Sequence, residues 1–250
     1  MRAAQAALSS QKAPLRRAVW PCSRRMCRRY RRRVILRLRP DANSRVRAGT
    51  LREDQSLAVV PNWRRALDDD STVTFRPIQP ADKAQLLDGF THLSTESKYR
   101  RFLTPLRDLS EARLRFLTEL DFVNHFAYVA ELSARAGRPG IGVGRWIRDG
   151  AEPDRAEMAV TVADEYQGHG IGGDLIHLLA WSAVFRGIRT LTALVLSSNK
   201  PMLALLEGVG ARQVGHSEGT IDFAFDLPGD LTVVDSLLAK RGLEPNHPRG

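Results

Sequence analysis

One short stretch of the chain has residue types and a spacing that suit the binding of a phosphate group. Between two apolar runs the chain reads Asp164-Glu165-Tyr166-Gln167-Gly168-His169-Gly170-Ile171-Gly172-Gly173. Its four glycines leave backbone N–H groups open to an anion because no Cβ atoms obstruct them, and the N-terminus of a following helix also favours negative charge. This stretch therefore predicts a phosphate-binding turn.

Several kinds of phosphate site use glycine turns, and the surrounding residues separate them. Gly168, Gly170 and Gly173 have the G-x-G-x-x-G spacing of a dinucleotide site, which requires an acidic residue at the end of the next strand to hold a ribose. That strand ends in Ser197-Ser198-Asn199 and the first acid beyond it is Glu207. A Walker loop is excluded because no Gly-Lys-Ser/Thr follows. A strand-to-helix turn without any ligand stays as the structural alternative.

The elements that must position this turn follow from hydrophobic patterns on either side of it. Residues 156–163 alternate as a strand, and a broad apolar stripe that begins at Ile171 predicts a helix packed on a sheet and ending near Gly187. A buried strand is expected next, over 189–196, then a short helix from Pro201 to Leu206 and two final strands near 212–216 and 220–227.

Upstream of the turn the pattern predicts helices followed by strands. A first strand over 73–78 leads into a helix opened by Gln79-Pro80-Ala81-Asp82, and two more helices are expected at 94–103 and 110–117. Strands at 125–132 and 141–148 then form an antiparallel pair. The order of elements indicates one α/β domain over residues 72–228, without internal repeats.

The positive charge of the chain is concentrated at its N-terminus. Of the formal net charge of +10, residues 1–40 contribute thirteen Lys and Arg and no acid, which leaves the remainder slightly acidic at −3. We expect residues 1–71 to be a disordered, Arg-rich extension, because few apolar residues there could offset chain entropy, and residues 229–250 to be a C-terminal tail. The charge therefore gives little support for nucleic-acid binding by the folded part.

Composition also bears on metals, membranes and location. Cys22 and Cys27 form a lone C-x4-C pair with no second pair or nearby histidines, so we expect no metal site. No apolar run approaches the roughly 18 to 20 residues of a membrane span, and Val34-Ile35-Leu36 is soon interrupted by arginine. We expect a cytoplasmic protein without a membrane partner.

At the turn the sequence resembles a known family. Gln167-Gly168-His169-Gly170-Ile171-Gly172 matches the Gln/Arg-x-x-Gly-x-Gly/Ala signature of GNAT-superfamily N-acetyltransferases, and the resemblance extends over about residues 72 to 228. Within the superfamily the chain is similar to bacterial Pat-like protein lysine acetyltransferase domains, as seen in Phe75-Arg76-Pro77-Ile78, Lys98-Tyr99-Arg100-Arg101-Phe102 and Ala156-Glu157-Met158-Ala159-Val160.

This resemblance implies an α/β (α+β) GNAT fold, with a mixed, mainly antiparallel sheet of six to seven strands and helices on both faces. It also implies acetyl-CoA as co-substrate. Backbone groups of the turn would hold its pyrophosphate, and strand residues before the turn would pair with its pantetheine arm. Asn199 either bonds the pantetheine or caps the following helix. The expected cofactor-binding residues are Val160, Thr161, Val162, Gln167, Gly168, His169, Gly170, Ile171, Gly172, Gly173 and Asn199.

Transfer of an acetyl group to an amine requires a base, because a lysine amine with a pKa of about 10.4 is protonated at neutral pH. Glu157 matches the glutamate that serves as base in Pat-like domains. Its structural alternative is a strand glutamate that points to solvent or pairs with Arg145. The resemblance fails at Leu206, where many relatives have a tyrosine that protonates the leaving thiolate, so no general acid is assigned.

The resemblance therefore predicts an acetyl-CoA-dependent N-acetyltransferase with a protein lysine as the expected acceptor. Alternatives are a small amine as acceptor, or an acyl-CoA sensor with little turnover, which the missing tyrosine supports. Tyr99, Arg100 and Arg101 either line the acceptor cleft or pack their helix against the domain.

Overall fold

The computed structural model describes residues 60–67, 71–133 and 139–246. They form one sheet of nine strands with the order β7-β8-β6-β5-β4-β3-β2-β1-β9. All neighbouring strands are antiparallel except β5 and β6, which are parallel. The strands are β1 (Asn62–Ala66), β2 (Thr72–Pro77), β3 (His125–Leu132), β4 (Gly140–Arg148), β5 (Arg155–Val162), β6 (Thr190–Leu196), β7 (Arg212–Ser217), β8 (Thr220–Asp226) and β9 (Glu244–Asn246).

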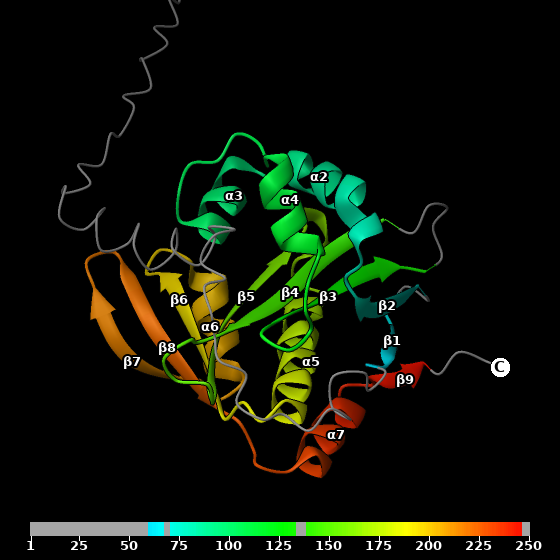
Figure 1. Ribbon diagram of the computed structural model, residues 1–250, viewed down its shortest axis with the longest axis vertical. Coiled ribbons are helices and arrows are strands. Elements are labelled where there is room, and N and C mark those ends of the chain that lie inside the picture. Colours follow the sequence, from blue (N-terminus) through cyan, green and yellow to red (C-terminus); the bar gives the residue numbers. More distant parts are fainter. Residues whose placement is uncertain (1–59, 68–70, 134–138, 247–250) are drawn as a thin grey trace, which may run out of the picture.

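Six α-helices within the described residues cover this sheet (Figure 1). Short 3₁₀ turns at Pro80–Asp82 and Asp164–Tyr166 precede α2 and α5. None of the helices in this described part is long and apolar enough to cross a bilayer. The helices are α2 (Lys83–His92), α3 (Thr95–Phe102), α4 (Glu111–Thr118), α5 (Ile171–Phe185), α6 (Lys200–Gly208) and α7 (Leu231–Lys240).

Helices lie on both faces of the sheet because its central strands are apolar on both sides. Along β3, Phe126 and Tyr128 belong to the main core with α5, whereas Ala127 and Val129 belong to a separate cluster on the other face. In Figure 1, α2, α3 and α4 group together at one side of the sheet and α5 and α7 at the other. The mixed α/β fold inferred from the resemblance is confirmed.

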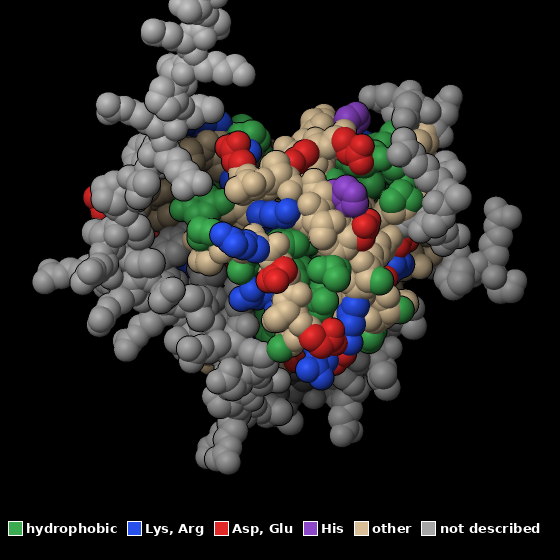
Figure 2. All heavy atoms as spheres, turned by 90° about the horizontal axis from the view of Figure 1, so that it is seen from above, with side chains coloured by type: hydrophobic (Ala, Val, Ile, Leu, Met, Phe, Trp, Pro, Cys, Tyr) green, Lys and Arg blue, Asp and Glu red, His purple; other side chains and the backbone are tan. Residues whose placement is uncertain are grey.

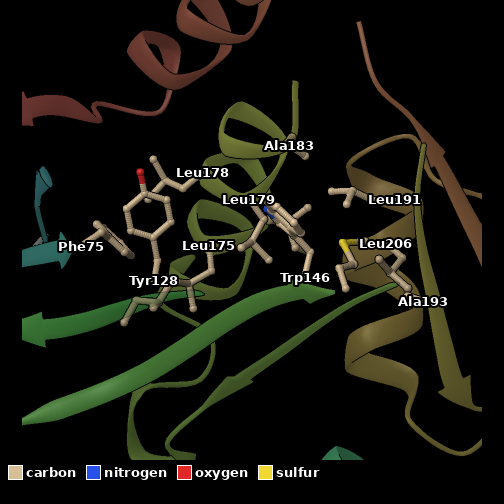
Figure 3. Close-up of a cluster of buried hydrophobic side chains, with 14 of the residues drawn as sticks. Phe75, Tyr128, Trp146, Leu175, Leu178, Leu179, Ala183, Leu191, Ala193 and Leu206 are labelled. Atoms are coloured by element: carbon tan, nitrogen blue, oxygen red, sulfur yellow. The ribbon is translucent and has the colours of Figure 1, made fainter. Parts of the chain in front are cut away.

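The main core lies between the sheet and α5, where the predicted helix after the glycine turn forms as expected. Leu175, Leu178 and Leu179 are fully buried against Tyr128 and Trp146 (Figure 3). Gly144 of β4 permits this close approach, because a Cβ there would lie 3.2 Å from the Leu175 Cβ. Packing at this density fixes the position of α5 and therefore of the turn that precedes it.

The sheet is larger than the predicted six or seven strands because both chain segments outside the predicted domain take part in it. Trp63 of β1 is 4% exposed and donates from Nε1 to the Tyr128 hydroxyl at 3.3 Å. At the other end α7 buries Val234 and Leu238, and β9 pairs with β1. The boundaries predicted at residues 71 and 229 therefore do not mark the edges of the folded part.

The predicted extension includes β1, a strand that hydrophobic alternation does not reveal because a single apolar side chain, Trp63, anchors a segment otherwise rich in arginine. Residues 1–59 of the predicted extension lie outside the described residues. Seen from above α2, α3 and α4, the surface carries basic and acidic side chains interspersed with apolar ones (Figure 2).

Candidate functional site

The site begins where two parallel strands separate. β5 and β6 pair only through Arg155, Ala156 and Glu157, although β5 continues to Val162 and pairs with β4 from Ala156 to Val162. The β5 main chain beyond Glu157 therefore has no strand partner on its β6 side within the described sheet. An extended chain with amide groups can pair with such an edge.

A cavity of about 490 Å³ lies at this separation. Its walls come from β5, β6, α6, the start of α5, the glycine turn and α3. Its lining residues include the predicted Val160, Thr161, Val162, Gln167, Gly168, Gly170, Gly172, Gly173 and Asn199. The structure thus brings the predicted strand and the predicted turn to one cavity.

Two of the turn glycines are required by backbone conformation. Gly168 and Gly170 have φ values of 84° and 80°, a region that strains any residue with a Cβ. Gly170 is the N-cap of α5, so the first N–H groups of that helix lie at the turn. The side chain of Gln167 donates to the Val162 carbonyl at 3.1 Å and to the Asp164 carboxylate at 2.9 Å, which holds the turn against the end of β5.

Close packing requires the other two glycines. A Cβ at Gly172 would lie 3.0 Å from Leu205 Cδ2, and one at Gly173 would lie 2.8 Å from Arg241 Nη2. The open backbone at residue 173 therefore makes room for a protein side chain as well as lining the cavity.

A cluster of Arg65, Asp174 and Arg241, which we call the arginine clamp, lies against the turn. The Asp174 side chain is 0% exposed and lies 2.6 Å from Arg65 Nε and 2.8 Å from Arg241 Nη2. Both arginines also donate to turn carbonyls, Arg65 to His169 at 2.7 Å and Arg241 to Gly170 at 3.2 Å. Burial raises the pKa of the Asp174 carboxyl, and the two guanidinium groups oppose that rise.

A second contact ties α3 to the turn. Asp164 accepts from the Ser94 backbone N–H at 3.0 Å and from the Ser97 hydroxyl at 2.5 Å, at the N-terminus of α3. Burial raises the pKa of Asp164, but these hydrogen bonds outweigh it and the net shift is downward. The contact places α3 over the cavity, where Arg100 and Arg101 line the wall. Tyr99, the third residue considered there, is 43% exposed.

His169 and Ile171, which the resemblance placed in the cofactor site, are not among the residues that line the cavity. His169 is exposed, with Nδ1 3.1 Å from the Gln167 carbonyl oxygen, and Ile171 is 1% exposed in the main core. Asn199 lines the cavity and also accepts from the Met202 N–H at 3.4 Å, so one side chain is placed for both predicted roles.

Glu157 lies at the last β5–β6 pair, where the strands begin to separate. Its charge acts on Arg101 of α3: burial lowers the pKa of Arg101 to about 10, and attraction to Glu157 opposes that shift. In the register Glu157 faces Ile147 and Arg145 faces Ala159, so Glu157 and Arg145 are diagonal neighbours on one face of the sheet. This face is opposite to α5.

Residues that sequence reasoning missed come mostly from outside the motif. Leu205 and Met202 of α6 line the cavity with Leu206, which is 1% exposed and gives no proton donor at that position. Arg65 and Arg241 had no local signal at all, because they meet Asp174 only through the fold. A burial pattern that alternates in Asn62–Ala66 is visible only once Trp63 is known to be inside.

With this geometry in view, comparison with known proteins gives a consistent result. A family model described as Acetyltransferase (GNAT) domain matches residues 72–212. The chain belongs to the GNAT acetyltransferase family, as the glycine signature had indicated.

Relatives within the family support the Pat-like assignment. Acetyltransferase Pat of Mycolicibacterium smegmatis is 36% identical over 158 residues, covering 63% of this chain and 46% of Pat. Acetyltransferase PA5475 of Pseudomonas aeruginosa is 29% identical over 149 residues, covering 60% of this chain and 80% of that protein. The chain thus spans less than half the length of Pat.

Solved structures agree with this. The GNAT domain of S. lividans PAT has 32% identity and a TM-score of 0.60, covering 66% of this chain and 96% of that domain. The yncA protein of Salmonella typhimurium, solved with acetyl-CoA, has 19% identity and a TM-score of 0.51, covering 63% and 95%, and shows a shared fold.

Proposed function

We propose that this protein transfers an acetyl group from acetyl-CoA to an amine, with a protein lysine as the acceptor. The observation that carries the proposal is the separation of β5 from β6 after Glu157. It leaves an unpaired edge of β5 in the same cavity as the glycine turn, which suits an anion. Family membership and the similarity to Pat support it.

The residues of the cavity fit the two chemical parts of acetyl-CoA. Main-chain N–H groups from Gln167 to Gly173, together with the start of α5, suit a pyrophosphate, because they combine open donors with a helix N-terminus. Backbone groups of Val160, Thr161 and Val162 suit the amides of pantetheine, which they would bind as an added strand. When bound, acetyl-CoA would supply a reactive thioester.

We assign to Glu157 the removal of the proton from the attacking amine. As the amine nitrogen bonds to the acetyl carbon, the carbon–sulfur bond breaks, and Glu157 takes the amine proton directly or through water. A backbone N–H of β5 near Val160 would polarise the acetyl carbonyl as negative charge develops. The leaving thiolate takes its proton from water, since Leu206 has no proton to give.

A sensor that binds acyl-CoA without useful turnover is the second candidate, and the apolar Leu206 in the cavity wall favours it. A thiol-release assay with acetyl-CoA separates the two functions. A lysine-containing peptide is compared with a polyamine at equal concentration, and binding of acetyl-CoA is measured by calorimetry. We expect thiol release with the lysine peptide. Binding of acetyl-CoA without thiol release to any amine would instead support the sensor, and absence of binding would contradict both.

A further inference from the structure

A second and smaller cavity, of about 90 Å³, lies on the face of the sheet that α2 and α4 cover. Most of its wall is apolar, with Leu86, Phe90, Leu109 and Leu117 among the lining residues. It shares Arg101 and Thr161 with the larger cavity, so the two adjoin. A group bound there would lie next to the expected position of the thioester.

Arg145 is the unusual member of this wall, because its guanidinium is buried and takes part in none of the ion pairs found in the described part of the chain. Arg145 is 3% exposed, and among the described residues no carboxylate forms an ion pair with its guanidinium. Nη1 donates to the Leu117 carbonyl at 3.2 Å and lies 3.1 Å from His125 Nε2. Nε is buried and has no hydrogen-bond partner within the described part of the chain.

The surroundings of Arg145 hold one acid, Glu157, which is its diagonal neighbour across β4 and β5 and whose charge acts on Arg101, so two guanidinium groups lie beside one carboxylate. Burial and the charge of Arg101 lower the pKa of Arg145 to about 9, which leaves the guanidinium charged at neutral pH. His125 stays neutral, since burial and then the charges of Arg145 and Arg101 lower its pKa to about 2. Buried charges in proteins are normally paired, so two guanidinium groups beside one carboxylate, with an unused N–H on Arg145, indicate room for a further anionic partner.

Asp82 also lines the smaller cavity but does not supply this partner. Its carboxylate accepts from Arg76 at 2.8 and 2.7 Å and from the Gln79 backbone N–H at 2.7 Å. In the register Arg145 lies opposite Ala159, which lines the larger cavity. The unsatisfied guanidinium is thus one strand away from the expected acyl site.

We propose that the smaller cavity binds a carboxylate carried by a substrate, with Arg145 and Arg101 as its anion-binding residues. The apolar wall would hold the carbon chain that connects this carboxylate to the reacting centre. Such a carboxylate belongs either to the acyl chain of the donor or to the amine acceptor. The inference rests on the proposed function for its biological use, but the binding of a carboxylate can be tested without turnover.

The direct test is the effect of a small carboxylate on unfolding. Propionate is compared with propionamide, a neutral molecule of the same size, in thermal unfolding of the full chain and of Arg145→Met. We expect propionate, but not propionamide, to raise the midpoint temperature of unfolding of the wild type. In Arg145→Met this rise should be lost. An equal effect of both compounds, or an unchanged rise in Arg145→Met, would show that Arg145 only anchors the end of α4 through Leu117. If Arg145→Met does not fold, the proposal is tested by the difference between propionate and propionamide in the wild type. That difference should then be lost in Arg101→Met.

Turnover then identifies the source of the carboxylate. For the donor, succinyl-CoA is compared with butyryl-CoA, which has the same number of acyl carbons. For the acceptor, lysine is compared with 1,5-diaminopentane, the same diamine without its carboxylate. We expect a preference of about tenfold or more in kcat/KM in one of the two pairs, lost in Arg145→Met. Thiol release without preference in either pair would overturn the proposal. Absence of thiol release in all cases would contradict the proposed function. Carboxylate binding by the smaller cavity would then be tested only by the comparison of propionate with propionamide in thermal unfolding.

Discussion

The arginine clamp makes the most detailed prediction about how the fold supports the site. Replacing Asp174 by Asn keeps the shape of the side chain but removes the charge that lies between Arg65 and Arg241. An amide offers one acceptor oxygen where the carboxylate offered two, and its NH₂ group faces a guanidinium. Both arginines would lose their anchor, and with it their fixed position against the turn.

The size of the effect follows from burial. Breaking a fully buried ion pair costs about 3–5 kcal/mol of unfolding free energy. Here the Arg65 and Arg241 side chains are 18% and 32% exposed, so water can solvate them in part, and we expect about 2–4 kcal/mol. Loosening the two hydrogen bonds to the turn carbonyls, at about 1 kcal/mol each, should raise the Kd for acetyl-CoA by about 5- to 30-fold.

The assay combines urea unfolding with calorimetric binding of acetyl-CoA. Asp235→Asn is the matched control, because this exposed residue accepts a hydrogen bond from Trp181 Nε1 at 2.8 Å, and an amide oxygen preserves that bond. The control should stay within about 0.5 kcal/mol of the wild type. An Asp174→Asn variant with wild-type stability and wild-type affinity would refute the role of the clamp.

Further predictions concern the elements that lie outside the recognisable motif. Trp63→Ala should lower the unfolding free energy by about 3–5 kcal/mol, measured in urea, and exposed Val233→Ala by less than about 0.5; equal effects would place β1 outside the cooperative fold. Arg76→Met should cost about 3–5 kcal/mol, because it leaves the buried Asp82 unpaired, while Arg64→Met, in an exposed pair, should cost about 0–1. Burial raises the pKa of Asp82, but Arg76 and a backbone N–H outweigh it, so the net shift is downward. The stability from this lowered pKa is present above the ordinary value of 3.8 and lost as pH falls below it, and a wild type and Arg76→Met with the same acid unfolding curve would contradict this.

The centre of the fold was predictable from the sequence because its signals are local. Alternation in residues 156–163, the glycine turn and the apolar stripe after Ile171 each specify one element, and they occur in the order that the chain needs. The resemblance then supplied the cofactor and the candidate base. These predictions required only neighbouring residues.

The periphery was not predictable because its signals are long-range. β1 has one buried apolar residue, Trp63, in a run of arginines, and its partner β9 is three residues long and contains a proline. Asp174 was one more residue of the predicted helix, and its partners lie 109 residues before it and 67 after it in the chain. A glycine at 173 was expected to serve only the phosphate, whereas the structure also places Arg241 against it.

In the proposed mechanism Glu157, at the last β5–β6 pair, takes the proton of the attacking amine. The most direct test of this role is the rate of acetyl transfer by Glu157→Gln at saturating acetyl-CoA, with the Kd for acetyl-CoA measured in parallel. We predict that kcat falls by about 10²- to 10⁴-fold while the Kd changes little, because the glutamine keeps the size of the side chain but cannot take the proton. An unchanged kcat in Glu157→Gln would contradict the account.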